Sequence, residues 1–248
     1  MYVITNEISS GDVISALRAV RKPVLPPLHR FEAHITSIKA WATSPPRVQI
    51  LSSAFWRLRQ YGLTDSMLQG LDSMGAVTMA IDDYVQGKPG GPTLGSIVRI
   101  KAAVQKRFLF LPTAEELNIT PSSKLNLYES CRLTAIIFSV AVFFPLPNTY
   151  SVLQTLVQRL KATINESGIE SHGAEFSGVL LWILVLGGIA ALDKPERSWF
   201  VSRLALLVQS LKIGWEEAED VLETFLWFEI ACSPGGRLLW DEALNLGV

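Results

Sequence analysis

The residues of this chain that could do chemistry gather in two short segments. The first is AIDDYVQG, in which Asp82, Asp83 and Tyr84 follow one another. Adjacent aspartates occur where carboxylates hold magnesium against a diphosphate. Such a site needs further acids one helical turn on, but Val85 and Gln86 occupy those positions. We therefore assign Asp82, Asp83 and Tyr84 to proton transfer rather than to a metal, the alternative being a solvated helix end.

The second segment, HRFEAH, contains His29, Glu32 and His34. On a helix the two histidines would lie about 140° apart, so one zinc ion could not bind both without distortion. We expect no metal site here and assign His34 as a general acid or base. Trp41 and Trp56 are the residues that we expect to contact an apolar substrate.

Motifs of the common cofactor-dependent and nucleophilic enzymes are missing from the sequence. It contains no Gly-x-Ser-x-Gly, P-loop, dinucleotide-binding fingerprint or Cys-His pattern. Hydrolase, kinase and oxidoreductase functions therefore have no support, and we expect no cofactor.

Composition narrows the choice of partners and compartment. With 22 basic and 23 acidic residues the net charge is -1, so no overall field attracts a phosphate backbone and we expect no direct contact with nucleic acid. Cys131 and Cys232 lie in apolar helical patterns and are expected to be reduced and buried, which indicates an intracellular protein. Residues 176–192 are uncharged but flanked by acids, and we predict a buried helix there rather than a membrane span.

Apolar residues recur at helical spacing from end to end, which predicts an all-α fold of about 10–11 helices in a single compact domain or two packed halves. Thr64 and Thr93 are the expected N-caps of two long helices. The polar segment 113–124 is the expected sub-boundary between halves. Beyond it we predict helices at roughly 125–143, 149–165, 172–191, 196–211, 215–231 and 235–245.

Several motifs follow one another in the order known from a protein family. They are VRIKAAVQKRFLFLP (98–112), YESCRLTAIIFSVAVFFPLP (128–147), LLWILVLGGIAAL (180–192), PERSWF (195–200), FLWFEIAC (225–232) and GGRLLW (235–240). Over roughly residues 65–245 the chain resembles the regulatory domain that lies downstream of the six-cysteine zinc cluster in fungal transcription factors. This resemblance implies a helical domain that receives a signal from a small apolar metabolite or a partner protein, without a catalytic residue set.

Packing accounts for most of these motifs. We expect the tryptophans and glycines in them to fix how helices cross, and the charged side chains of Glu129 and Arg132 to pair on one helix. The residues with this structural role are Trp182, Gly187, Gly188, Trp199, Trp227 and Trp240.

Two functional hypotheses follow from the sequence. With two cysteines the chain cannot build the zinc cluster, so we expect it not to regulate promoters by direct contact. One hypothesis is a cofactor-free cyclase or isomerase of fungal specialised metabolism, acting on an apolar terpenoid or polyketide intermediate in a water-excluding pocket. The alternative is a non-catalytic regulatory protein that senses a ligand or heterodimerises. The apolar helical surface of the chain also leads us to expect a homodimer.

Overall fold

The structure, a computed structural model, describes residues 15, 16, 22, 50–118, 127–143, 150–169 and 174–246. Every regular element within these ranges is helical, which confirms the predicted all-α fold. The first half contributes the 3-10 helix η1 (Ser53–Tyr61), α4 (Asp65–Val85) and α5 (Leu94–Phe110). The remainder contributes α6 (Leu127–Phe138) with the π-helical turn η2 (Ser139–Phe143), α7 (Tyr150–Ser167), η4 (Ala174–Phe176), α8 (Ser177–Ala190), α9 (Arg197–Leu211), α10 (Trp215–Glu223) and α11 (Glu229–Leu246).

The two long helices of the first half begin where the sequence predicts. The Thr64 hydroxyl accepts a hydrogen bond from the Met67 amide at 3.3 Å, and the Thr93 hydroxyl accepts one from the Ser96 amide at the same distance. Each threonine thus satisfies an amide that the first helical turn leaves without a partner. Gly62, at φ 103°, supplies the left-handed residue that ends η1 and turns the chain toward α4.

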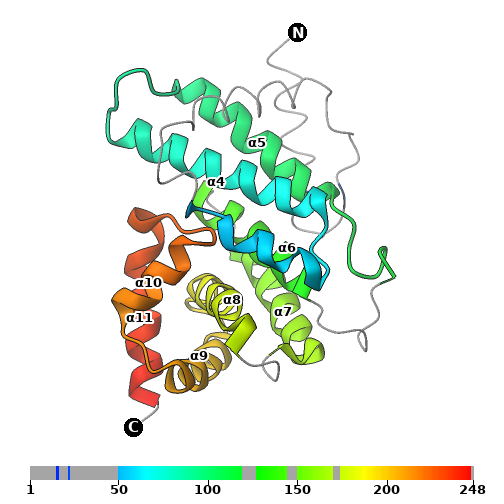
Figure 1. The fold of residues 1–248 in the computed structure, drawn as a ribbon, viewed down its shortest axis with the longest axis vertical. Coiled ribbons are helices and arrows are strands. Elements are labelled where there is room, and N and C mark those ends of the chain that lie inside the picture. The colour runs from blue at the N-terminus through cyan, green and yellow to red at the C-terminus, as the bar shows by residue number, and fades with distance from the viewer. Residues whose placement is uncertain are drawn as a thin grey trace.

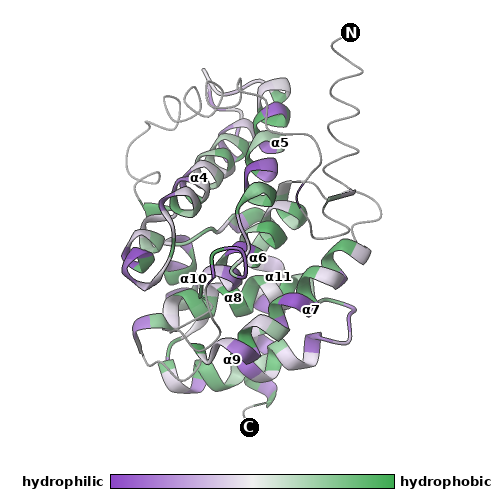
Figure 2. Cartoon of the chain, turned by 90° about the vertical axis from the view of Figure 1, so that its right-hand side faces the viewer, coloured by the Kyte–Doolittle hydropathy of each residue, from purple (hydrophilic) through white to green (hydrophobic). Residues whose placement is uncertain are grey.

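The helices form two levels around one continuous core. Figure 1 shows α4 and α5 side by side above, and α8, α9, α10 and α11 below, with α6 between the levels. A view turned by 90° shows the same arrangement (Figure 2). Buried apolar residues from η1 to α11 belong to a single cluster. A boundary at 113–124 stays a prediction, and residues 119–126 lie outside the described part.

At the centre of the lower level lies α8, which packs against α6, α7, α9, α10 and α11. A Cβ added at Gly187 would lie 2.4 Å from the ring of Phe200, and one at Gly188 would lie 2.4 Å from a methyl carbon of Leu239. Both glycines therefore permit neighbouring side chains to approach the backbone, as the sequence predicts.

The buried position of α8 agrees with the prediction for residues 176–192. No helix in the described ranges has the length and apolar character needed to cross a membrane.

The last two helices differ from the prediction. The sequence indicates helices at roughly 215–231 and 235–245, but α10 ends at Glu223 and α11 begins at Glu229 and carries Pro234 inside it. Residues 224–228, which we call the connector, are not helical. The carbonyls of residues 224–226 accept hydrogen bonds from Ala54, Ser52 and Trp182, as described below, and the helical pattern is broken at this point.

Candidate functional site

A solvent-facing cleft lies between the C-terminal end of α4 and the connector, with a volume of about 160 Å³. Most of its wall is apolar and comprises Ile50, Leu51, Met79, Trp227, Phe228 and Ile230. Its polar lining comprises Thr78, Asp82, Gln86, Glu223 and Glu229. Apolar surface with a few polar groups is typical of small-molecule sites.

Three hydrogen bonds to backbone carbonyls shape the connector side of the cleft. The indole N–H of Trp182 donates to the Leu226 carbonyl at 2.8 Å, inside the core. The amides of Ser52 and Ala54 donate to the carbonyls of Phe225 and Thr224 at 2.6 and 3.1 Å. Because these carbonyls bond to distant groups, the connector keeps a non-helical course that turns Trp227 and Phe228 to the cleft.

An aromatic cluster lies directly behind the connector. The ring of Phe55 packs edge-on against Trp182 and Phe225, with centroids 5.0 and 4.9 Å apart. All three side chains are buried. This cluster fixes η1, α8 and the connector relative to one another, because such contacts are both apolar and orientation-dependent.

Glu219 of α10 holds the Trp227 ring in place. Its carboxylate accepts hydrogen bonds from the Trp227 indole N–H, at 3.2 Å, and from the Ser233 hydroxyl. The Trp215 ring packs against Trp227 with centroids 6.3 Å apart. The Trp227 side chain, which is buried and only 4 % exposed, is therefore fixed at the back of the cleft.

The predicted catalytic residues of α4 face different surroundings. Asp82 is half-buried and lines the cleft. The carboxylate of Asp83 forms an ion pair with Lys88, 2.5 Å away, and the Tyr84 side chain is 44 % exposed. Neither Asp83 nor Tyr84 belongs to the cleft lining. Of these three residues, the structure thus brings only Asp82 to the site.

The remaining predicted residues do not join Asp82. His34 and Trp41 lie outside the described residues. Trp56 is 43 % exposed on η1, and its indole N–H donates to the Asp72 carboxylate at 3.1 Å. Asp72 also accepts a hydrogen bond from the Ser52 hydroxyl at 2.8 Å, so Trp56 helps to fasten η1 to α4.

Trp56 also borders a second hollow, which is about 750 Å³ in volume and more open to solvent than the cleft. Tyr61 and Glu175 line this hollow, and the Tyr61 hydroxyl donates a hydrogen bond to the Glu175 carboxylate. That bond raises the pKa of Tyr61. We assign no ligand to so shallow a surface, because it encloses little of any bound molecule.

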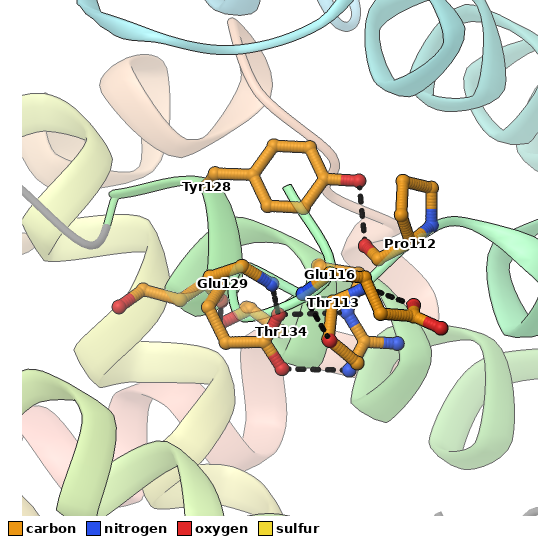
Figure 3. Close-up of polar contacts among 9 residues, drawn as sticks. Pro112, Thr113, Glu116, Tyr128, Glu129 and Thr134 are labelled. Carbon is orange, nitrogen blue, oxygen red and sulfur yellow. Dashed lines mark hydrogen bonds and ion pairs between the residues drawn. The ribbon is translucent and has the colours of Figure 1, made fainter. Parts of the chain in front are cut away.

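A buried polar cluster joins the end of α5 to α6 (Figure 3). The Arg132 guanidinium donates to the Glu129 carboxylate at 2.6 and 2.9 Å, which confirms the predicted pair. Glu129 also accepts the Ala114 amide at 3.2 Å, and the Tyr128 hydroxyl donates to the Pro112 carbonyl at 2.9 Å. Each buried charge is therefore compensated, and the cluster has a structural role.

Burial changes the pKa of several groups in the core. Desolvation raises the pKa of Tyr128 to about 12, and that of Cys232 to about 12. Desolvation also raises the pKa of the fully buried Cys131 thiol well above its usual range. Both cysteines are free and buried, as predicted, and are poor nucleophiles at neutral pH.

Metal binding at the cleft acids has no geometric support. Within the described ranges, no three side chains of histidine, cysteine, aspartate or glutamate lie close enough together to hold one ion. Asp82, Glu223 and Glu229 therefore do not form a group of this kind.

Sequence reasoning missed most of this site. It assigned no role to Glu223, Phe228 or Glu229. Its interpretation of Trp227 as a packing anchor agrees with the burial and ring contacts of that residue. The available signal was the FLWFEIAC segment, where apolar and acidic residues meet in a short aromatic-rich stretch.

Comparison with known proteins supports the family interpretation. A family model described as "Fungal specific transcription factor domain" matches residues 98–225, just over half of the 248-residue chain. This match extends from α5 to the connector and is shorter than the predicted similarity over residues 65–245. Neither the curated proteins nor the solved structures gave a match.

Proposed function

We propose that this chain, which belongs to the fungal specific transcription factor domain family, binds a small apolar metabolite in the cleft between α4 and the connector. The observation that carries the proposal is the mostly apolar wall of the cleft, which Phe228 and a small exposed part of the otherwise buried Trp227 form opposite the polar end of α4. An apolar ligand would gain about 25 cal/mol for each Å² of apolar surface that it removes from water.

The size of the cleft limits what enters it. Its volume of about 160 Å³ is close to that of an engineered apolar cavity of about 150 Å³ that binds benzene. A ring or a branched alkyl group therefore fits inside, and the rest of a larger metabolite would lie across the rim formed by Ile50 and Ile230, which are both exposed.

Direct binding of a neutral apolar dye tests the proposal. N-phenyl-1-naphthylamine carries a phenyl ring of the right size, and we expect its fluorescence to rise on binding. Met79→Trp fills the cleft and should abolish this signal, whereas Val85→Trp places the same ring on an exposed position of α4 outside the cleft. Equal dye binding by both variants would refute the proposed site.

Catalysis is the second candidate function, and the position of Asp82 favours it. A half-buried carboxylate beside apolar surface can transfer a proton to or from a bound intermediate. We propose on this basis a cofactor-free cyclase or isomerase acting on a terpenoid or polyketide intermediate. His34, Asp83 and Tyr84 stay candidate catalytic residues, with Trp41 and Trp56 as candidate substrate contacts.

Turnover separates the two functions. In a reconstituted pathway, Asp82→Asn should abolish product formation while dye binding persists if Asp82 is a catalytic acid or base. His34→Ala, Asp83→Asn and Tyr84→Phe, assayed singly, test the other assignments. Dye binding with no turnover by the unmodified protein on any offered intermediate would favour the regulatory function.

Assembly and location are also proposals. We infer a homodimer from the exposed apolar residues of α9 and α11, including Leu206, Leu238 and Leu244. Light scattering coupled to size-exclusion chromatography tests it, and a monomer at micromolar concentration would refute it.

The reduced, buried cysteines support an intracellular location. Absence of direct nucleic-acid binding stays a prediction, which a mobility-shift assay checks.

A further inference from the structure

We infer that the ligand of this cleft carries an unbranched apolar chain, which leaves the cleft past Ile230 and lies along the surface of α11. This inference rests on the proposed function, because the group that anchors the ligand binds in the same cleft. It follows from the small volume of the cleft, from the apolar residues that continue beyond its rim and from the polar residues that end them.

The cleft by itself encloses only part of a metabolite. Its volume of about 160 Å³ accepts a ring or a branched alkyl group, and it faces solvent. Ile230 lines the cleft and is nevertheless 59 % exposed, so much of its apolar surface is available outside. Ile230 lies in the first turn of α11, and Figure 1 shows this helix leading away from α4 to the C-terminus. A larger ligand therefore meets the surface of α11 as it leaves the cleft.

Three exposed apolar residues follow one another on the face of α11 that borders the cleft. They are Ile230, Pro234 and Leu238, which we call the α11 strip. Because they are spaced by four residues, each lies only about 40° around the helix from the one before. The Leu238 side chain is 48 % exposed. Single exposed apolar residues are common, but a continuous apolar surface that joins a cleft is typical of a binding site.

The α11 strip has a defined length and a polar end. Leu238 follows Ile230 by eight residues, which is a distance of about 12 Å along the helix axis. An extended alkyl chain spans this distance with about ten bonds. The next residues on the same face are Asp241 and Asn245, which are polar and exposed. The strip is a single row of side chains, so it fits an unbranched chain of medium length that ends in a polar group.

Two probes that differ only in chain length test the inference. Both 3-phenylpropan-1-ol and 8-phenyloctan-1-ol carry the same ring for the cleft and the same terminal hydroxyl group, but only the longer chain extends to Leu238. Both are titrated against the complex of the full chain with N-phenyl-1-naphthylamine, and displacement of the dye is measured. Full burial of one CH₂ group raises affinity about fourfold, and a chain on an open surface is covered on one side only. We therefore expect the five additional CH₂ groups to raise affinity at least about tenfold.

Two variants assign this gain to the α11 strip, because a longer chain binds more tightly to almost any apolar surface. Leu238→Ser should weaken the binding of 8-phenyloctan-1-ol about threefold or more and leave 3-phenylpropan-1-ol unchanged. Leu206→Ser makes the same change on α9, at a side chain that is 59 % exposed and outside the cleft, and should leave both alcohols unchanged. Both leucines belong to the surface from which we infer a homodimer, so this pair also controls for an effect on assembly.

The outcomes separate this inference from the proposed function. Equal affinity of the two alcohols, or a gain that Leu238→Ser leaves intact, would overturn the inference while the apolar site stands. Equal weakening by Leu238→Ser and Leu206→Ser would do the same, because the effect would then come from assembly. So would displacement by neither alcohol, with the dye still bound and still sensitive to Met79→Trp. A dye that does not bind, or that binds regardless of Met79→Trp, would overturn both proposals.

Discussion

Replacing Trp182 by phenylalanine should both destabilise the fold and loosen the cleft. The Trp182 side chain is fully buried, and its indole N–H donates to the Leu226 carbonyl at 2.8 Å. Phenylalanine keeps the apolar ring contacts with Phe55 and Phe225 in part but removes this donor. The carbonyl of Leu226 would then be buried without its partner.

The expected loss of unfolding free energy has two parts. A buried acceptor left without a partner costs about 1–3 kcal/mol. The smaller ring leaves a void against Phe55 and Phe225, which we place at about 1 kcal/mol by comparison with large-to-small core substitutions. The variant Trp182→Phe should therefore lose about 2–4 kcal/mol of unfolding free energy, which is a fall in Tm of roughly 5–15 °C.

Urea unfolding followed by circular dichroism measures the stability change, and dye titration measures the cleft. Because the connector loses an anchor, we expect dye affinity to fall about threefold or more. Trp199→Phe is the matched control, since Trp199 is only partly buried and lies on α9, away from the cleft. A loss below about 1 kcal/mol for Trp182→Phe, or unchanged dye affinity, would refute the argument that this hydrogen bond shapes the connector.

Three further predictions concern the core. Gly187→Ala should cost about 1–3 kcal/mol through overpacking, because the added Cβ would lie 2.4 Å from the buried ring of Phe200. Gly95→Ala is the control: a Cβ added there has no neighbouring atom within 4 Å, so this variant should be neutral or slightly stabilising in thermal melts of both proteins. Glu129→Ala should cost about 3–5 kcal/mol in urea unfolding, because it leaves the Arg132 charge buried without its partner. The double variant Glu129→Leu, Arg132→Met should recover most of that loss. If the single and the double variant lost the same unfolding free energy, this explanation would be wrong. Burial raises the pKa of Cys232 to about 12, while an unfolded thiol ionises near about 8.5, so unfolding free energy should fall as pH rises from about 9 toward 12. The variant Cys232→Ala should weaken this dependence without removing it, because the buried Cys131 thiol contributes in the same direction, as measured by urea unfolding at pH 8 and 10.5.

Local sequence information determined the helical character of this protein. Apolar residues at three- and four-residue steps predict the all-α fold, and the threonines at 64 and 93 predict where α4 and α5 begin. Family membership was also accessible, because the motifs in residues 98–225 keep their order along the chain. Periodicity and capping act within a few residues, so a single sequence carries them in full.

Long-range contacts decided where the cleft lies and which residues line it. Nothing in the local pattern distinguishes Asp82 from Asp83; successive residues on a helix point about 100° apart, and the packing of α4 against the core turned only the first to the cleft. The break between α10 and α11 was equally hidden. It depends on Trp182, Ser52 and Ala54, which are far from the connector in sequence and bond to its carbonyls. A helix continues only while its carbonyls accept hydrogen bonds from amides of the same helix. Which distant donors bond to the carbonyls of the connector instead is seen only in the tertiary structure.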